Sequence, residues 1–191
     1  MMTRLSYIER DDADPRLQAV YDAVDSYGPF ANQTRTMAHC PPVLEHIMAL
    51  LFALRREGRL SQRHIELLNV TVAKLNQCDY CLAHHAPKLE VQGMSQEGIA
   101  RLPAHEEHPE LDETDRLVVD YSVQVSQAPR RITDGFFERL RARFSEAEIA
   151  ELTWRIGLAG AFNHINQALD IDTESDLIQL GAGRMRHDAD V

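Results

Sequence analysis

The chain has 191 residues, 44% of them hydrophobic and 26% charged, which is typical of a globular protein and excludes a disordered or fibrous class. Lys and Arg number 20 and Asp and Glu number 30, so the formal net charge is −10, and the basic residues are scattered. A nucleic acid or an anionic membrane surface needs positive charge gathered in one place. Neither kind of partner is therefore expected.

The sequence also predicts where the protein works. No run approaches the roughly 20 apolar residues of a membrane span, and residues 1–14 carry acids where a secretory signal would be apolar. We therefore expect a cytoplasmic protein that does not enter a membrane. Cytoplasmic thiols are kept reduced, so a closely spaced cysteine pair is more often catalytic or metal-binding there than a static crosslink.

Helical periodicity dominates the N-terminal half, and no stretch alternates long enough to predict a strand. Apolar residues at three- and four-residue steps predict helices over about 14–27, over 41–58 with two prolines in the first turn, and over 62–75 with Ser61 as N-cap. A break at 76–78 precedes a predicted helix over 79–91, with Gly93 placed as a C-terminal cap.

The C-terminal half is predicted to be helical as well. A short helix should follow Ser95, and the acidic run 103–113 is interpreted as a solvated connection between the two halves. Further helices are expected over about 117–125 and 132–144. Ser145 and Glu148 form a capping box that opens a long apolar helix, and the tail 181–191 is expected to be frayed. The sequence thus predicts an all-α array with short connections, folded as a single domain over 1–191.

The chemistry is concentrated in the core motif region 60–93. Cys78 and Cys81 form a Cys-x-x-Cys pair at the start of a predicted helix, where a thiol pKa is lowered and a disulfide can close. His85 follows Cys81 by four residues, so both side chains share one helix face. A histidine there can accept the thiol proton or stabilise the thiolate.

Glu66 lies 12 residues before Cys78, too far for contact along one unbroken helix. If the chain reverses near residues 76–77, Glu66 is about 10 residues before the turn and His85 about 9 after it. The carboxylate could then orient and charge-balance the imidazole. On the residues alone, an ordinary surface glutamate paired with Arg63 or Lys74 remains the simpler interpretation.

These residues resemble a known family, the alkylhydroperoxidase D-like branch of the carboxymuconolactone decarboxylase superfamily. Its motif Glu-x11-Cys-x2-Cys-x3-His is met at Glu66, Cys78, Cys81 and His85 without a gap. The resemblance extends to residues 28–32, 40–44, 131–134 and 162–164 and covers most of the chain from about 5 to 175.

The resemblance implies an orthogonal multi-helix fold with two helical halves, assembled into homo-oligomers such as trimers, hexamers or dimers. It also implies an oxidoreductase that reduces organic hydroperoxides, with an antioxidant role and no bound cofactor or metal. Cys81 would attack the peroxide, Cys78 would resolve the sulfenic acid, and His85 with Glu66 would relay protons.

A lipoyl-bearing or thioredoxin-like dithiol protein would then restore the pair. The chain departs from the family at Tyr80, where some peroxidases have a second histidine; the nearby histidine here is His84.

Other interpretations stay open on the sequence. The cysteines could be small buried hydrophobes, or could join His84 and His85 in a zinc site, although no second Cys-x-x-Cys completes one. The protein could instead be a lyase on a small carboxylated lactone, or a disulfide oxidoreductase or redox sensor without peroxide specificity. Cys40 is expected to be a packed, unpaired thiol. Asn163 and His164 are interpreted as core or interface residues that could also line a pocket.

Overall fold

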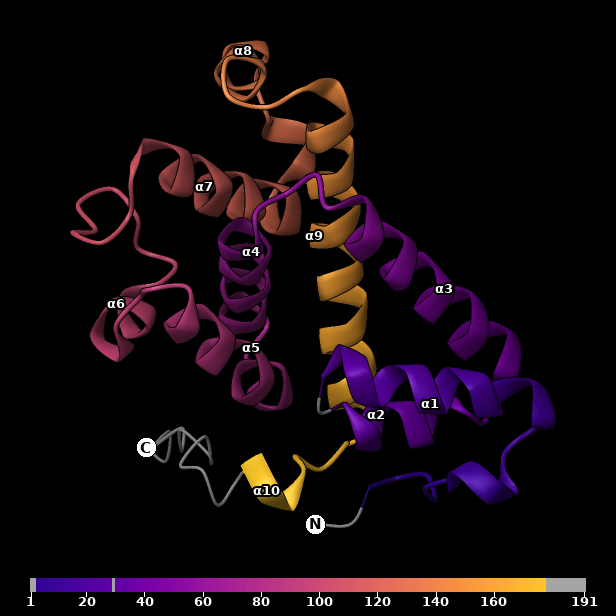
Figure 1. Ribbon diagram of the computed structural model, residues 1–191. Helices are drawn as coiled ribbons and strands as arrows, with labels where there is room; N and C mark the ends of the chain where they lie inside the picture. The colour runs from indigo at the N-terminus through magenta and orange to yellow at the C-terminus, as the bar shows by residue number, and fades with distance from the viewer. Residues whose placement is uncertain (1–2, 29, 178–191) are drawn as a thin grey trace. The chain divides into compact units, whose positions relative to one another are not determined.

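The computed structural model describes residues 3–28 and 30–177, and these residues form helices and connections without a strand (Figure 1). The predicted frayed tail, 181–191, lies outside the described residues. The contacts within the chain divide it into two compact units, residues 1–59 with 166–191, and residues 60–165. The predicted all-α fold class is confirmed.

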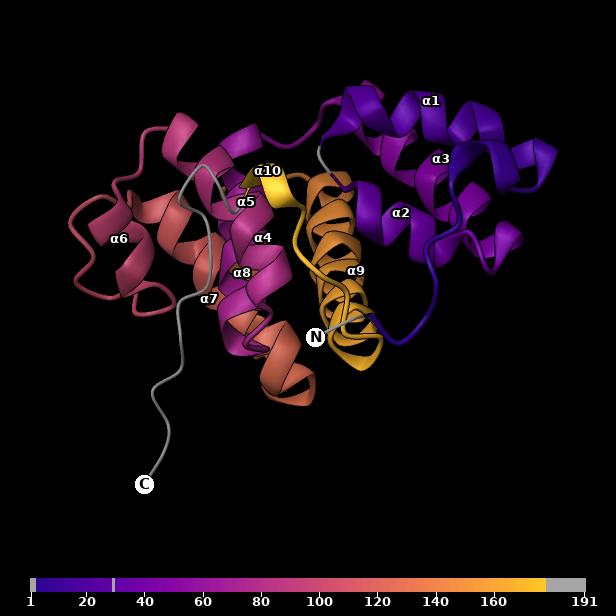
Figure 2. The same ribbon diagram turned by 90° about the horizontal axis from the view of Figure 1, so that it is seen from below.

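The first unit contains three helices that pack on one another, α1 (Gln18–Tyr27), α2 (Ala31–Met37) and α3 (Pro41–Glu57) (Figure 2). Short 3-10 turns, η1 (Arg10–Asp12) and η2 (Pro15–Leu17), precede them, and α10 (Ser175–Leu177) follows near the C-terminal end of the described chain. Proline opens α3 and Gly58 ends it in the left-handed conformation, at φ 59°. Both ends of this helix are therefore where the sequence predicts them.

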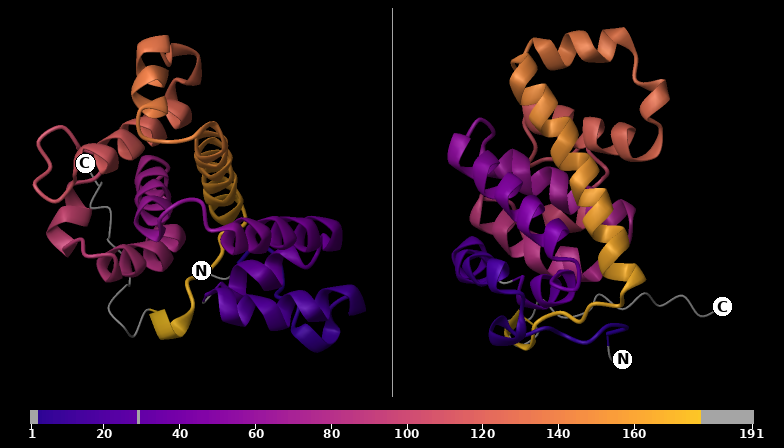
Figure 3. Two further views of the ribbon diagram at one scale, coloured as in Figure 1. Left: turned by 45° about the horizontal axis from the view of Figure 1, so that its top comes forward. Right: turned by 90° about the vertical axis from the view of Figure 1, so that its right-hand side faces the viewer.

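The second unit contains α4 (Gln62–Leu75), α5 (Asp79–Val91), α6 (Gln96–Arg101), α7 (Glu113–Gln127), η3 (Pro129–Arg131), α8 (Asp134–Arg141) and most of α9 (Glu146–Ala168). Helix α4 packs against both α5 and α7. Figures 1 and 2 show α6 and α9 on opposite sides of α4, and Figure 3 shows α9 as one continuous helix. Buried apolar residues of α4, α7 and α9 form the core. They include Leu67, Leu68, Val118, Leu152 and Ile156.

Side-chain caps fix the helix starts where the sequence places them. Ser61 Oγ accepts from the His64 backbone N–H at 3.1 Å, and Ser95 Oγ accepts from the Gly98 N–H at 3.0 Å. The capping box at the start of α9 is present, because Glu148 accepts from the Ser145 backbone N–H while Ser145 Oγ accepts from the Glu148 N–H. These local signals hold because they need only a few consecutive residues.

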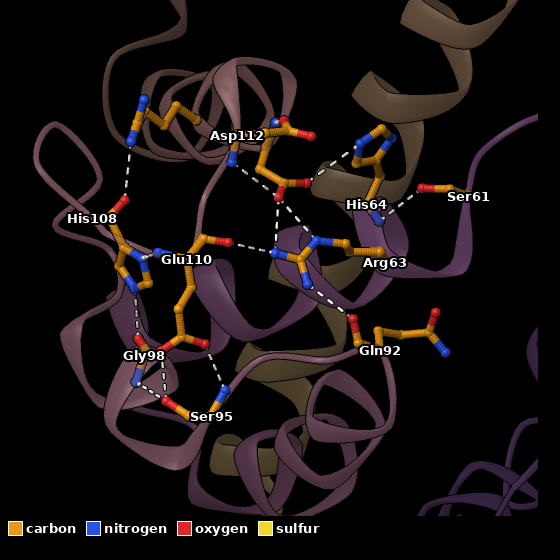
Figure 4. Close-up of polar contacts among 11 residues, drawn as sticks. Ser61, Arg63, His64, Gln92, Ser95, Gly98, His108, Glu110 and Asp112 are labelled. Atoms are coloured by element: carbon orange, nitrogen blue, oxygen red, sulfur yellow. Dashed lines mark hydrogen bonds and ion pairs between the residues drawn. The ribbon is translucent and has the colours of Figure 1, made fainter.

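The run 103–113 lies within the second unit, and it is not simply a solvated connection, because its residues make the polar contacts drawn in Figure 4. His108 is fully buried, where its Nε2–H donates to the Gly98 carbonyl at 2.9 Å and its Nδ1 accepts from the Glu110 N–H. Arg63 donates to the buried Asp115 carboxylate and to the Gln92 and Glu110 carbonyls. Buried polar groups require such partners, so this polar run is part of the packing between α4, α6 and α7.

Gly157 gives a stability prediction. It is exposed in the interior of α9, and a Cβ added there would meet nothing within 4 Å. Gly157→Ala is therefore expected to stabilise the protein by about 1 kcal/mol, because alanine loses less backbone entropy than glycine in a helix. The rise in the urea midpoint at constant m-value measures this gain.

The matched control is Gly98→Ala in α6. There a Cβ would lie 2.6 Å from a Glu110 carboxylate oxygen, and Ser95 holds that carboxylate by two hydrogen bonds. Alanine should bring no gain at this position. Equal gains at both sites would mean that helix propensity alone decides the effect.

Across residues 3–28 and 30–177, no helix is long and apolar enough to cross a membrane.

Candidate functional site

The turn between α4 and α5 creates the site by reversing the chain. Helix α4 ends at Leu75, and Gln77 follows in the left-handed conformation at φ 55°. The Gln77 N–H donates to the Lys74 carbonyl and the Cys78 N–H donates to the Ala73 carbonyl. This is the bonding pattern of a Schellman motif, which satisfies the last carbonyls of a helix and turns the chain sharply. The break predicted at 76–78 is thus a defined cap that leads directly into α5.

Cys78 and Cys81 lie at the start of α5 and form a disulfide, with their Cα atoms 5.3 Å apart. Cys78 is the N-cap of α5, and its Sγ accepts from the Cys81 backbone N–H at 3.3 Å. The residues are almost fully buried, with 1% of Cys78 and 5% of Cys81 exposed. Since the N-terminal end of a helix favours negative charge, the reduced pair lies where a thiolate is stabilised.

Glu66 and His85 meet within one chain. The His85 Nδ1–H donates to Glu66 Oε2 at 2.7 Å, and Gln62, one turn before Glu66, donates to Oε1 at 2.5 Å. Glu66 is 2% exposed, so it is not the surface carboxylate that the residues alone favoured. With Nδ1 bonded to the carboxylate, Nε2 is the ring nitrogen opposite that bond, and His85 follows Cys81 by one turn of α5.

Burial and pairing set the charge states of this pair. Burial raises the pKa of Glu66, but the hydrogen bond and charge of His85, with Lys88 and Gln62, outweigh it, and the net pKa is lowered. Burial lowers the pKa of His85 below its ordinary value, although Glu66 opposes this effect. At neutral pH the pair is therefore an ionised carboxylate holding a neutral imidazole, which is the form of a general base.

Asn163 is a residue of the site whose contact the sequence did not predict. Its Nδ2 donates to Cys81 Sγ at 2.9 Å, and its Oδ1 accepts from Asn76 Nδ2 at 3.0 Å. Asn163 continues the buried positions Ile156 and Ala159 of α9 at helical spacing, so an amide on an apolar stripe was the available signal. His164, its neighbour, is exposed and points away from this stripe.

His84 and Cys40 do not take part in the contacts between Glu66, His85 and the cysteine pair that are described above. His84 is buried on another side of α5, where its ring stacks on Tyr80 at 4.2 Å between centroids and its Nδ1 bonds the Tyr80 carbonyl. It therefore acts as a packing residue in α5. Cys40 is a free thiol at the N-cap position of α3, where its side chain is exposed, so its predicted packing is wrong.

Within the described ranges, no group of three or more His, Cys, Asp and Glu side chains is arranged to hold a metal ion. A hollow of about 630 Å³ opens among α7, α8 and α9, lined by Tyr121, Phe137, Thr153 and Trp154 among others. None of the motif residues lines it. Trp154 is 69% exposed there, so it is not a core residue.

The segment that contains the motif matches a known protein family. Residues 41–110 match the model of the carboxymuconolactone decarboxylase family, and this segment contains all four residues of the Glu-Cys-Cys-His motif. Residues 41–110 are therefore similar to this family. Among curated protein sequences, none matches the chain significantly.

Solved structures named for the alkylhydroperoxidase AhpD share the fold of this chain. A peroxidase-related protein with an alkylhydroperoxidase AhpD core from Ralstonia eutropha JMP134 is 19% identical and superposes with a TM-score of 0.81 over 96% of this chain and 98% of its own. A putative antioxidant defence protein AhpD from Agrobacterium tumefaciens is 26% identical over 73% of this chain and 95% of its own, with a TM-score of 0.65.

A third similar structure is named for a different reaction. The debrominase Bmp8, solved as a cysteine-to-alanine variant with 2,3,4-tribromopyrrole, is 18% identical and covers 94% of this chain and 96% of its own, with a TM-score of 0.76. The alkylhydroperoxidase D-like fold therefore occurs in proteins named for peroxide and for halide chemistry. The reaction of this chain has to be argued from its own residues.

Proposed function

We propose that this protein is a thiol-dependent peroxidase that reduces organic hydroperoxides. The observation that carries the proposal is the arrangement of four side chains. Cys78 and Cys81 form a disulfide, His85 follows Cys81 by one helical turn, and the buried Glu66 carboxylate holds the Nδ1 of this histidine. A nucleophile, its base and a group that orients the base are the parts that nucleophilic catalysis requires.

In the first step the neutral His85 accepts the Cys81 thiol proton, and Glu66 stabilises the imidazolium that forms. The Cys81 thiolate attacks the terminal peroxide oxygen, so the S–O bond forms as the O–O bond breaks. His85 returns its proton to the departing alkoxide. The products are an alcohol and a sulfenic acid on Cys81.

In the second step Cys78 attacks the Cys81 sulfenic sulfur. The S–S bond forms, the S–O bond breaks, and the leaving hydroxide takes the Cys78 proton and departs as water. The pair has then given two electrons to the peroxide. A dithiol protein, lipoyl-bearing or thioredoxin-like, restores the thiols by exchange, and no bound cofactor or metal takes part.

A thiol count tests the proposal directly. The reduced protein is expected to have three titratable thiols per chain, since it has three cysteines, and one equivalent of cumene hydroperoxide should leave one. Mass spectrometry should find the Cys78 to Cys81 disulfide. The Cys40→Ser variant, which lacks the exposed thiol, should pass from two thiols to none. Unchanged thiol counts after peroxide would overturn the proposal.

Two other kinds of substrate should be compared with the hydroperoxide in the same assay. A thiol pair can in principle take a halogen from a brominated aromatic ring, which the name of the similar debrominase suggests, and then bromide appears as the disulfide forms. A lyase acting on a carboxylated lactone would release carbon dioxide with its thiols unchanged. Comparing alcohol, bromide and carbon dioxide release at equal substrate concentration separates the three reactions.

The proposal also covers the oligomeric state of the enzyme and its place in the cell. We expect a homo-oligomer, a trimer, hexamer or dimer, working in the cytoplasm as part of peroxide defence. Sedimentation equilibrium measures the oligomer size.

A further inference from the structure

We infer that the Asn163 amide is the hydrogen-bond donor that stabilises the Cys81 thiolate, and that Asn76 positions this amide. This inference rests on the proposed use of Cys81 as a nucleophile, because it names a further group that touches the reacting sulfur. It adds to the site a residue from α9, about 80 residues further along the chain than the motif.

The contact itself identifies the donor. Asn163 Nδ2 lies 2.9 Å from Cys81 Sγ, and both residues are buried. Neither a disulfide sulfur nor a thiolate has a proton to donate, so the amide nitrogen has to face it. A hydrogen bond to a charged acceptor strengthens when the sulfur becomes a thiolate, so the same contact favours the ionised form.

Asn76 determines which end of the Asn163 amide faces the sulfur. Asn76 Nδ2 donates to Asn163 Oδ1 at 3.0 Å, which holds the oxygen away from Cys81. Asn76 is the C-cap of α4, and the Schellman motif that follows fixes its backbone. The turn that brings Glu66 to His85 therefore also orients the donor to Cys81.

The contact distinguishes the two cysteines. Cys78 Sγ is the N-cap and accepts the Cys81 backbone N–H at 3.3 Å, while Cys81 Sγ accepts the side-chain amide at 2.9 Å. The N-cap position alone would favour Cys78 as the thiolate. The amide, together with His85 on the same helix face, gives Cys81 the stabilisation that offsets this advantage.

Alkylation of single thiols tests the inference without any peroxide. In a Cys40→Ser, Cys78→Ser background only Cys81 reacts, and its iodoacetamide rate against pH gives the midpoint of thiolate formation. Asn163→Leu should move this midpoint upward by about one to two pH units, because a hydrogen bond to a charged group is lost. Asn163→Asp, which has the same shape and adds a negative charge, should move it further.

The order wild type, leucine, aspartate is the expected result, and Asn76→Ala should give a smaller upward shift. A purely structural role would lower the melting temperature of these variants without moving the midpoint in this order. If Asn163→Leu does not fold, Asn163→Ser and Asn76→Ala provide the same comparison. Equal midpoints in all folded variants would overturn the inference.

The outcomes also separate this inference from the proposed function. If the midpoints shift but the protein does not consume peroxide, Asn163 still donates a hydrogen bond to the Cys81 thiolate, and that thiolate serves another reaction. Normal peroxide consumption with unshifted midpoints would retain the peroxidase and remove Asn163 from the mechanism.

Discussion

Cys81→Ser is expected to reduce hydroperoxide turnover by at least about 10³-fold, because a serine hydroxyl at neutral pH replaces the thiolate that breaks the O–O bond. Cys78→Ser should behave differently. It should consume one equivalent of peroxide and stop, with a Cys81 sulfenic acid that dimedone traps and mass spectrometry detects. Stopped-flow mixing with cumene hydroperoxide measures both variants.

Cys40→Ser is the matched control for this pair. It makes the same chemical change at an exposed cysteine in the other compact unit, and turnover should remain at the wild-type rate. If Cys78→Ser lost the first equivalent and Cys81→Ser kept it, the roles of the two cysteines would be reversed. Wild-type turnover in both variants would remove the pair from the reaction.

His85→Leu and Glu66→Gln are expected to slow the oxidation of Cys81 by about 10²-fold to 10⁴-fold, since that is the usual contribution of a positioned acid or base. The two effects should not add, because the carboxylate acts through the imidazole to which it is bonded at 2.7 Å. Single-turnover oxidation at pH 7, followed for both variants and the double variant, measures this coupling.

The pH profile of the same reaction has a predicted direction. Burial lowers the pKa of His85 below its ordinary 6.5, so the neutral base is present at pH 7 and is lost as the pH falls through that lowered value. Glu66 raises the pKa of His85 against the effect of burial. Glu66→Gln should therefore move the acid limb of the profile to lower pH while it lowers the plateau.

Glu97→Gln is the control for the change in charge. It removes one carboxylate at an exposed position of α6, so both the plateau and the acid limb should stay as in the wild type. An acid limb that moved to higher pH in Glu66→Gln would contradict the assigned charge states of the pair.

The same shifts give the pH dependence of stability. The folded-state pKa of Glu66 is lowered, so its contribution is present above the unfolded value and is lost as pH falls through the folded one. The folded-state pKa of His85 is also lowered, so the unfolded chain binds its proton first as the pH drops below about 6.5. Both groups therefore make the folded protein less stable in acid.

Local signals in the sequence were sufficient for the helices with clear caps, whereas α2 was not predicted and α7 is longer than expected. The proline start of α3, the Ser61 cap of α4 and the capping box of α9 each depend on neighbouring residues, and each is where the pattern predicts it. The motif spacing allowed Glu66 to meet His85 if the chain reversed near residues 76–77, but the residues alone favoured a surface glutamate.

The misses have a common physical cause. The burial of His108 depends on a carbonyl of α6, and the exposure of Cys40 depends on which surface of α3 the fold covers. The contact of Asn163 with Cys81 depends on the arrangement of α9 beside the α4 and α5 hairpin. The partner of Asn163 is 82 residues away and that of His108 is 10 residues away in α6, so no pattern within one helix contains them.

The sequence by itself therefore determined the all-α class, the starts of the helices with clear caps and the Cys-x-x-Cys pair with a histidine on the same helix face. Spacing along a helix fixes direction and distance over one or two turns, and these features need nothing more. The tertiary structure decided that Glu66 is buried against His85 and that an amide from α9 reaches Cys81. Those contacts join helices from separate parts of the chain, so only their packing could bring them about.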